Sequence, residues 1–351
     1  MVRGLQLSVR TAGCVLMSGN GNLRFRVQPG GALTGRLRVP GDKSISHRSI
    51  MLGSLAEGIT EVSGFLEGED SLATLSAFRA MGVQIDGPDA GRVQVRGVGL
   101  QGLQAPAGDL YLGNSGTSMR LMSGLLSGQA FSTTLTGDTS LSGRPMKRVV
   151  APLTSMGASI ETTETGTAPL RVQGGRELSG IDYAMPVASA QVKSSLLLAG
   201  LYASGTTCVS EPAPTRDHTE RMLAGMGYSL QREGNRVCLQ GGGRLQAIAI
   251  DVPADISSAA FFLVGASIAP GSELVLEHVG MNPTRTGVID ILQRMGADIT
   301  VMNERDVGGE PVADLRVRSA QLHGIDIPPA LVPLAIDEFP VVFVAAACAK
   351  G

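Results

Sequence analysis

The sequence predicts an α/β protein of two domains, built from a repeated unit of alternating helices and strands. The chain has 351 residues, a length typical of two domains. Two separate patterns each recur at intervals of about 70 residues, which indicates internal repetition. Hydrophobic residues make up 43% of the chain, enough for substantial cores, but aromatic residues make up only 3%. The cores therefore have to be packed mainly by aliphatic residues, alanine and methionine.

The first pattern is an apolar helix that ends in Met-Gly and is followed by a short alternating run. A glycine after a helical pattern is the expected left-handed cap, and the alternating run predicts a strand. The four copies are FRAMGVQI, LTSMGASI, LAGMGYSL and LQRMGADI, with their glycines at Gly82, Gly157, Gly227 and Gly296.

The second pattern is a helix of small residues that ends in glycine and is usually followed by a strand rich in Thr and Val. Its five copies end at Gly58, Gly128, Gly205, Gly271 and Gly351. The two patterns alternate, so the predicted unit is helix, strand, helix, strand, with connecting strands. The fifth copy ends where the sequence ends, without its strand and partner helix. Because a half-built unit would leave apolar faces unburied, we expect the chain to be truncated at its C-terminus.

Charge and cysteine content argue against several classes of function. Lys plus Arg number 29 and Asp plus Glu number 31, so the net charge of −2 gives no general attraction to nucleic acid or to anionic membranes. No apolar run reaches the length of a membrane span. The cysteines show no metal-ligand spacing, which argues against zinc and predicts free thiols in a reducing cytosol. They are Cys14, Cys208, Cys238 and Cys348. Residues 1–22 are predicted to be a poorly specified N-terminal extension.

The strongest candidate site is the segment PGDKSISHRS, residues 40–49, in which a turn leads directly into a helix. Ser44 and Arg48 are four residues apart and share a helix face. Lys43 lies at the N-terminal end, where free N–H groups and the helix dipole favour anions. These groups would suit a phosphate or a carboxylate. A capped helix start with solvated charges is an equally weighted alternative.

Four further polar segments lie at or just before predicted helix starts. LGNSGTSMR, residues 112–120, can present backbone N–H groups to an anion but is not a nucleotide-binding loop. SGRPM places Arg144 in an extended loop before a repeat helix. In ASAQVKS, Ser189 is a predicted N-cap and Gln191 a candidate ligand for a carboxylate or hydroxyl group. In PTRDHTE a helix is predicted to start, and His218 is expected to be a surface histidine.

The last segment, AIDEFP, places Asp337 and Glu338 between apolar stretches, where a carboxylate could act as a general base. For each of these segments a structural role as a turn or cap remains open. If the repeat helices pack in parallel, their N-terminal ends meet on one face and form an anion site without a large net charge.

Six motifs, in this order, resemble the EPSP synthase family. They are PGDKSISHRS, GNSGTSMR, SGRPM, ASAQVKSSLLLAGL, TRDHTERML and IDEFP, and the resemblance runs from about Phe25 to Gly351. The first, fourth and fifth motifs are similar to the class that includes glyphosate-tolerant bacterial enzymes. The resemblance implies two similar domains, each an inside-out α/β barrel of three βαβαββ units. One domain would span residues 41–252, and the other, incomplete, would combine residues 23–40 with 253–351.

The resemblance also implies an activity. The family transfers the enolpyruvyl group of phosphoenolpyruvate to the 5-hydroxyl of shikimate 3-phosphate and releases phosphate, with no metal or organic cofactor. The chain is accordingly expected to be a cytoplasmic monomer with these two small-molecule substrates. The residues implied to bind shikimate 3-phosphate are Lys43, Ser44, Arg48, Ser189, Ala190, Gln191, Arg216 and Asp337. Those implied to bind phosphoenolpyruvate are Lys43, Asn114, Gly116, Arg144 and Gln191. Asp337 would accept the hydroxyl proton, and Lys43 is the second implied catalytic residue.

Two departures from the family pattern carry expectations. The family's later Lys-Glu-Ser-Asp-Arg motif, a further Arg and a C-terminal Lys are absent, so we expect this chain alone to have little or no activity. Gly116 stands where tolerant relatives carry alanine, so a completed enzyme should be sensitive to glyphosate.

Two alternatives to this function are weighed. The related UDP-N-acetylglucosamine enolpyruvyl transferase uses a loop cysteine, which has no counterpart here. A non-catalytic fragment that binds shikimate 3-phosphate, or needs a complementing polypeptide, is the alternative from another class.

Overall fold

The computed structural model describes residues 15–19, 22–26 and 30–351, with side chains described from residue 30 onward. The described chain forms two compact units. Unit 1 comprises residues up to Val39, together with Ala254–Arg305 and Pro311–Gly351, and unit 2 comprises Pro40–Pro253 and Asp306–Glu310. Segment 306–310, which the expected boundaries assigned to the other domain, belongs to unit 2, because Arg221 donates to the Gly309 carbonyl oxygen and His218 pairs with Glu310.

Unit 2 contains three four-stranded sheets with the same strand pattern. Their orders are β15-β4-β6-β5, β7-β8-β10-β9 and β11-β12-β14-β13. In each sheet the first two strands are parallel and the following pairs are antiparallel. The strands are β4 (Glu57–Ser63), β5 (Gln84–Asp89), β6 (Arg92–Val98), β7 (Leu110–Tyr111), β8 (Thr133–Thr136), β9 (Ser159–Glu161), β10 (Leu170–Gln173), β11 (Asp182–Ala184), β12 (Thr206–Ser210), β13 (Leu230–Glu233), β14 (Arg236–Gln240) and β15 (Ala249–Asp251).

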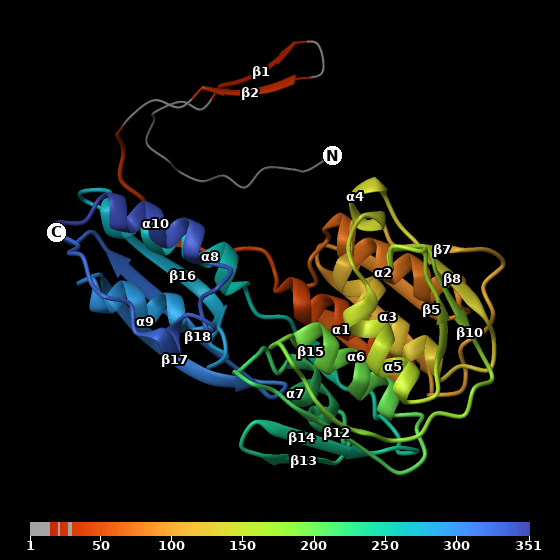
Figure 1. Cartoon of the computed structure of the whole chain (residues 1–351). Helices are drawn as coiled ribbons and strands as arrows, with labels where there is room; N and C mark the ends of the chain where they lie inside the picture. The colour runs from red at the N-terminus through yellow and green to blue at the C-terminus, as the bar shows by residue number, and fades with distance from the viewer. Residues whose placement is uncertain (1–14, 20–21, 27–29) are drawn as a thin grey trace. The chain divides into compact units, whose positions relative to one another are not determined.

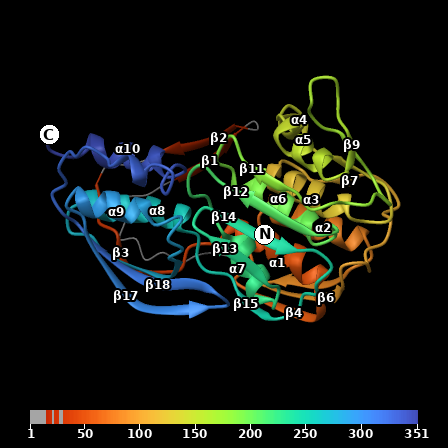
Figure 2. The ribbon, with the colours of Figure 1, turned by 60° about the horizontal axis from the view of Figure 1, so that its bottom comes forward.

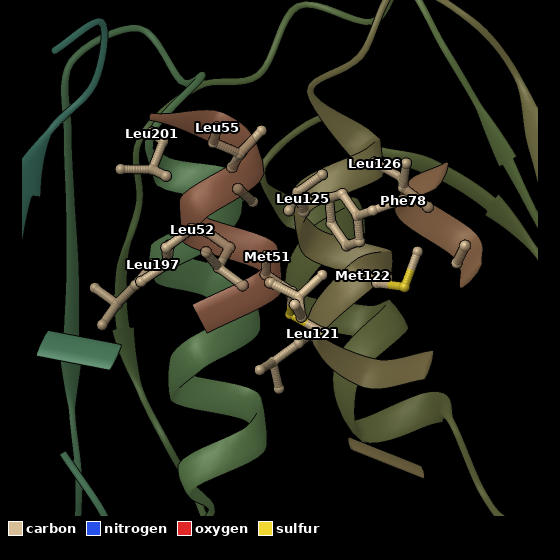
Figure 3. Close-up of a cluster of buried hydrophobic side chains, with 14 of the residues drawn as sticks. Met51, Leu52, Leu55, Phe78, Leu121, Met122, Leu125, Leu126, Leu197 and Leu201 are labelled. Carbon is tan, nitrogen blue, oxygen red and sulfur yellow. The ribbon is translucent and has the colours of Figure 1, made fainter. Parts of the chain in front are cut away.

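Helices α1, α3 and α6 of unit 2 lie inside these sheets, and the other helices of the unit pack around them (Figures 1 and 2). They are α1 (Lys43–Leu55), α2 (Glu69–Ala80), α3 (Gly116–Ser127), α4 (Thr139–Ser142), α5 (Lys147–Ser155), α6 (Ala190–Gly200) and α7 (His218–Gly225). The small-residue helices α1, α3 and α6 are almost wholly buried. Figure 3 shows Leu52, Leu121 and Leu197, one from each of these helices, in the same apolar cluster. Gly124 allows α3 and α6 to pack closely, since a Cβ there would overlap the Ser195 carbonyl oxygen.

Unit 1 repeats this arrangement once, with the sheet order β17-β18-β16-β3. Its strands are β3 (Thr34–Leu37), β16 (Glu273–Gly280), β17 (Asp298–Val307) and β18 (Glu310–Arg318), and the end of β17 and the start of β18 lie within segment 306–310. Its helices are α8 (Ile256–Ile268), α9 (Gly287–Arg294), the 3₁₀ turn η1 (Pro329–Leu331) and α10 (Phe339–Ala347). Strands β1 (Val15–Gly19) and β2 (Asn22–Arg26) form an antiparallel pair. The rest of the predicted extension, residues 1–14 and 20–21, lies outside the described residues.

The predicted repeat is confirmed as a βαβαββ unit. Helices α2, α5, α7 and α9 each end at a methionine C-cap, and the glycine that follows has a positive φ of 86°, 101°, 83° or 92°. Each of the four methionines is buried, so the same dipeptide ends the helix and anchors it in the core. In the sheet β15-β4-β6-β5, the first strand comes last in the sequence. It lies at the end of segment Pro40–Pro253 and pairs in parallel with β4. In the sheet of unit 1, the strand that pairs in parallel with β16 is β3, which precedes the whole of unit 2 in the sequence.

The expectation of free thiols is wrong for two cysteines. Cys208 and Cys238 are directly opposite each other on the neighbouring strands β12 and β14 and form a disulfide. The two residues are 30 positions apart in the sequence, and only the strand register brings them together. Cys348 is an exposed free cysteine, and Cys14 lies outside the described residues.

Candidate functional site

The candidate site in unit 2 is formed where the first turns of α1, α3 and α6 meet. Each helix has a side-chain N-cap, because Asp42, Ser115 and Ser189 accept a hydrogen bond from a backbone N–H three residues later. Arg48 of α1 donates to Ser194 of α6, and Arg120 of α3 donates to Gln191 of α6. The helix ends that attract anions therefore lie together at one end of the unit.

The first motif contributes one exposed and one buried cation. Lys43 begins α1, and its ammonium lies 3.3 Å from Asp70. Arg48 is only 4% exposed and donates from Nε to Thr219 Oγ1 at 2.7 Å, and from Nη1 to the Ser44 carbonyl oxygen at 2.9 Å. Burial lowers the pKa of Arg48 to about 10, so the guanidinium stays charged at neutral pH. Helices α1, α6 and α7 thus hold a fixed positive charge between them.

Arg144 is held by the glycine-rich loop, as part of a chain of hydrogen bonds. Its guanidinium donates to Asn114 Oδ1, and Asn114 Nδ2 donates to Asp138 Oδ2 at 2.7 Å. Asp138 also accepts from the Leu141 N–H, and the hydrogen bond from Asn114, followed by that from Leu141, lowers the pKa of the Asp138 carboxyl. Asn114 therefore joins the arginine to the cap of the following short helix, α4.

Gly116 lies where two arginines leave no room for a side chain. A Cβ at this position would be 2.9 Å from Arg144 Nη1 and 3.0 Å from Arg120 Nη1. The first distance is shorter than real Cβ contacts and the second is at their lower limit, so a side chain here requires the flexible ends of both arginines to shift.

Arg120 belongs to this cluster, although it was not among the site residues predicted from the sequence. It lies in α3, is 7% exposed, and donates from Nη1 to Gln191 Oε1 at 2.7 Å. The Gln191 amide in turn donates to Thr117 Oγ1 at 3.1 Å. The signal was present, because Gly116 and Arg120 are four residues apart in a helix and share a face.

The remaining predicted residues of unit 2 border this cluster. Ser189 caps α6, and Ala190 is the first residue of that helix. Arg216 is half-buried just before α7, and its charge is among the influences that lower the pKa of Arg48. Lys193, from the same motif as Gln191, is directed into the protein, where it pairs with Glu211 and Glu220.

The expectation of a surface histidine at position 218 is wrong. His218 is 2% exposed, and its Nδ1 lies 2.8 Å from Glu310 Oε1. Its partner comes from the short segment 306–310, 92 residues away in sequence, so no local pattern could have indicated the burial.

Asp337 lies in unit 1, unlike the other predicted site residues, and is exposed. The neighbouring Glu338 is buried and is the N-cap residue of α10. It accepts a hydrogen bond from the Ser257 hydroxyl group and lies 3.8 Å from Arg285.

A buried chain of hydrogen bonds links α1 to the start of α3. His47 Nδ1 lies 2.7 Å from Thr74 Oγ1, which lies 2.6 Å from Ser118 Oγ, and this hydroxyl is 2.7 Å from Ser115 Oγ. Burial, followed by the charges of Arg48 and Lys43, lowers the pKa of His47 to about 3. The imidazole is therefore neutral at physiological pH, and its hydrogen bond fixes α1 relative to the cap of α3.

The neutral state of His47 predicts an acid-sensitive fold. The unfolded chain takes up a proton at this histidine near pH 6.5, whereas the folded chain does so only near pH 3, so the free energy of unfolding falls as the pH drops through this window. The expected loss from His47 is about 2 kcal/mol at pH 5. His47→Gln should therefore flatten the dependence of stability on pH between 7 and 5, as measured by urea unfolding.

The exposed His323 supplies the matched control for that measurement. His323→Gln removes an exposed histidine instead of a buried one, so a change seen only in His47→Gln is due to the buried imidazole. An equally steep acid dependence in His47→Gln and in the unsubstituted protein would contradict the prediction.

Other features of the described residues add no second site of this kind. Two hollows in unit 2, of about 470 Å³ and 510 Å³, share no residue with the cluster above. The described part of the chain contains no group of three or more His, Cys, Asp or Glu residues that could hold a metal ion. None of its helices is both long enough and apolar enough to cross a membrane.

Comparison with known proteins gives consistent matches. The model of the EPSP synthase (3-phosphoshikimate 1-carboxyvinyltransferase) family matches residues 27–351. The 3-phosphoshikimate 1-carboxyvinyltransferase of Alkalilimnicola ehrlichii is 76% identical over 329 residues, which is 94% of this chain and 74% of the relative. That of Methylococcus capsulatus is 71% identical over 93% of this chain and 75% of the relative. The solved EPSP synthase from Acinetobacter baumannii has a TM-score of 0.87 and 62% identity, covering 92% of this chain and 73% of its own.

Proposed function

The chain belongs to the EPSP synthase family, and from this premise we propose that the cluster at the starts of α1, α3 and α6 binds the two substrates of its reaction. The activity is the transfer of the enolpyruvyl group of phosphoenolpyruvate to the 5-hydroxyl of shikimate 3-phosphate, which gives EPSP and phosphate in the shikimate pathway of aromatic amino-acid biosynthesis. The enzyme is a transferase of the class 3-phosphoshikimate 1-carboxyvinyltransferase.

One observation carries the proposal: Arg48 joins α1 to α6, Arg120 joins α3 to Gln191 of α6, and Arg144 lies beside Arg120 at the start of α3. The substrates together carry two phosphate groups and carboxylates, so they need several fixed donors and positive charges in one place. Arginine suits this role because its planar fork can donate two parallel hydrogen bonds to a phosphate or carboxylate. The net charge of the chain is −2, so the attraction has to be local.

We assign the shikimate 3-phosphate side to the α1 and α6 starts. Lys43, Ser44 and Arg48 present an ammonium, a hydroxyl and a guanidinium near one helix end. Ser189, Ala190 and Gln191 begin the adjacent helix, and Arg216 adds a charge near Arg48. Phosphoenolpyruvate is assigned to the neighbouring α3 side, with Asn114, Gly116 and Arg144, and is shared by Lys43 and Gln191.

The reaction requires the enzyme to transfer a proton and to stabilise negative charge. Addition of the hydroxyl to the enolpyruvyl double bond needs a base for the hydroxyl proton, and Asp337 is the proposed proton acceptor. The Lys43 ammonium would offset the negative charge of the reacting phosphate group. Holding both substrates in contact lowers the entropic barrier of a reaction between two molecules.

Titration calorimetry tests this function directly. We expect shikimate 3-phosphate to bind first and phosphoenolpyruvate to bind to the resulting complex, with release of inorganic phosphate measured in the same sample. Binding of shikimate 3-phosphate without phosphate release would favour a non-catalytic fragment. Failure to bind shikimate 3-phosphate would refute the assignment of the α1 and α6 starts.

We further propose that the enzyme is sensitive to glyphosate, although its motifs resemble those of the glyphosate-tolerant class, because Gly116 stands where tolerant relatives carry alanine. The expected consequence is that Gly116→Ala weakens glyphosate binding, because the added methyl group displaces both Arg144 and Arg120. Overpacking of this kind costs about 1–3 kcal/mol, which corresponds to a rise in Kd of about 5- to 150-fold. Calorimetric titration of glyphosate into the complex with shikimate 3-phosphate measures it.

A matched glycine provides the control for that substitution. Gly108 has open space around its Cβ position and an ordinary φ, so Gly108→Ala should leave glyphosate affinity unchanged. Unaltered affinity in Gly116→Ala would contradict a close fit at this position. The proposed domains are residues 41–252 and residues 23–40 with 253–351, except that segment 306–310 belongs with the former. A cytoplasmic monomer is the proposed working form.

A further inference from the structure

Arg120 is a buried cation that lacks a buried counter-ion. Its side chain is 7% exposed, and its hydrogen-bond partner is the neutral Gln191 carboxamide. Among the described residues no carboxylate lies within ion-pair distance of it, and its buried Nε has no hydrogen-bond partner. Burial, followed by the charges of Arg148 and Arg144, lowers the pKa of Arg120 to about 10, so it remains charged at neutral pH.

A buried charge of this kind is costly unless an opposite charge offsets it. Packing of the helix does not require this charge, because a neutral side chain of similar length would fill the same space without the cost of burying a cation. An anionic ligand would supply the missing charge whenever the site is occupied.

The geometry also shows where such an anion would lie. Arg120 Nη1 and Arg144 Nη1 both lie within about 3 Å of the position that a Cβ on Gly116 would occupy. The two guanidinium groups therefore flank the same small volume. In the first turn of α3 the Gly116 and Ser118 N–H groups already donate within the protein, which leaves the Thr117 N–H for an anion. One phosphate or carboxylate group there could accept hydrogen bonds from both arginines.

We propose that Arg120 is a direct binding residue for the phosphoryl or carboxylate group of the ligand held over Gly116, acting together with Arg144. The identity of that ligand as phosphoenolpyruvate rests on the proposed function. The role of Arg120 in binding an anion does not depend on it. The competing explanation is that Arg120 acts only through Gln191, whose carboxamide it orients.

Two substitutions separate these explanations. Arg120→Gln removes the charge but keeps an amide that can still donate to Gln191 Oε1. Thr117→Val removes the other hydrogen bond to Gln191 and leaves the charge in place. We expect Arg120→Gln to raise the Kd of phosphoenolpyruvate about 10- to 100-fold in the presence of shikimate 3-phosphate, and Thr117→Val to raise it less than about 3-fold.

The exposed Arg148 is the matched control, because its substitution shows whether the loss of any nearby positive charge weakens phosphoenolpyruvate binding. It is the second residue of the neighbouring helix α5, and its charge acts more strongly on Arg120 than that of Arg144 does. Arg148→Gln should change the Kd of phosphoenolpyruvate less than about 3-fold, because solvent screens an exposed charge. An equal loss in Arg148→Gln or in Thr117→Val would overturn the proposal.

A second measurement keeps the inference independent of catalysis. In protein labelled with ¹⁵N-arginine, the Nε–H resonance of Arg120 can be assigned by its disappearance in Arg120→Gln. We expect that resonance to shift on addition of phosphoenolpyruvate, and also on addition of inorganic phosphate. A shift with inorganic phosphate but no binding of shikimate 3-phosphate would leave the Arg120 site standing and refute the proposed function. An Arg120 resonance unmoved by either anion would overturn the inference.

Discussion

Replacing Lys193 by methionine is expected to lower the free energy of unfolding by about 3–5 kcal/mol. The Lys193 side chain is 2% exposed, and its ammonium lies 3.0 Å from Glu211 and 2.7 Å from Glu220. Methionine fills a similar volume but leaves two buried carboxylates facing each other without a cation. Equilibrium urea unfolding, followed by circular dichroism, measures the change.

Two controls separate the lost charge from the altered packing. Lys147→Met replaces an exposed lysine at the start of α5 and should change stability by less than about 0.5 kcal/mol. Adding Glu211→Gln and Glu220→Gln to Lys193→Met removes the unpaired charges, so this triple variant should regain a large part of the lost stability. If the triple variant is no more stable than Lys193→Met, the carboxylates are not the cause.

In a form of the enzyme that turns over, replacing Lys43 by methionine should have the largest effect on activity, a loss of turnover of about 100- to 1000-fold. Lys43 is the proposed contact to both substrates, and it lies at the N-terminal end of α1. Its side chain is 52% exposed and pairs with Asp70 at the surface, so removing it should change stability little. Phosphate release at saturating substrates, together with the Kd of shikimate 3-phosphate, measures the loss.

Lys43→Arg is the informative companion to that variant. It keeps the positive charge but places a broad planar fork where a compact ammonium stood, so it should retain shikimate 3-phosphate binding better than it retains turnover. Normal turnover in Lys43→Met would exclude Lys43 from the catalytic machinery. Equal losses in both variants would indicate that position, rather than charge, is what the site needs.

Local physics explains why the repeat was predictable. A helix that ends at Met-Gly needs only that dipeptide, because the glycine takes the positive φ that other residues avoid. The three N-caps were similarly local, since each joins residues three positions apart. The βαβαββ pattern then follows from the order of these elements along the chain.

The site could be predicted only as a set of segments. Motifs indicated Lys43, Gly116, Arg144 and Gln191 as candidates, but the hydrogen bonds that connect the candidate segments cross long stretches of sequence. Arg120 and Gln191 are 71 residues apart, and Arg48 and Thr219 are 171 apart. The spacing of Arg120 from Gly116 was visible in the sequence, but the burial of Arg120 beside a second arginine was not, because that burial depends on the packing of distant segments.

The sequence by itself therefore determined the family, the repeat, the helix starts and the residue types that can bind anions. Only the tertiary structure decided that His218 is buried against Glu310, that Cys208 pairs with Cys238, and that Lys193 points inward. The reason is physical: caps and turns depend on neighbours within one helical turn. Burial, counter-ions and strand register depend on which distant elements pack together.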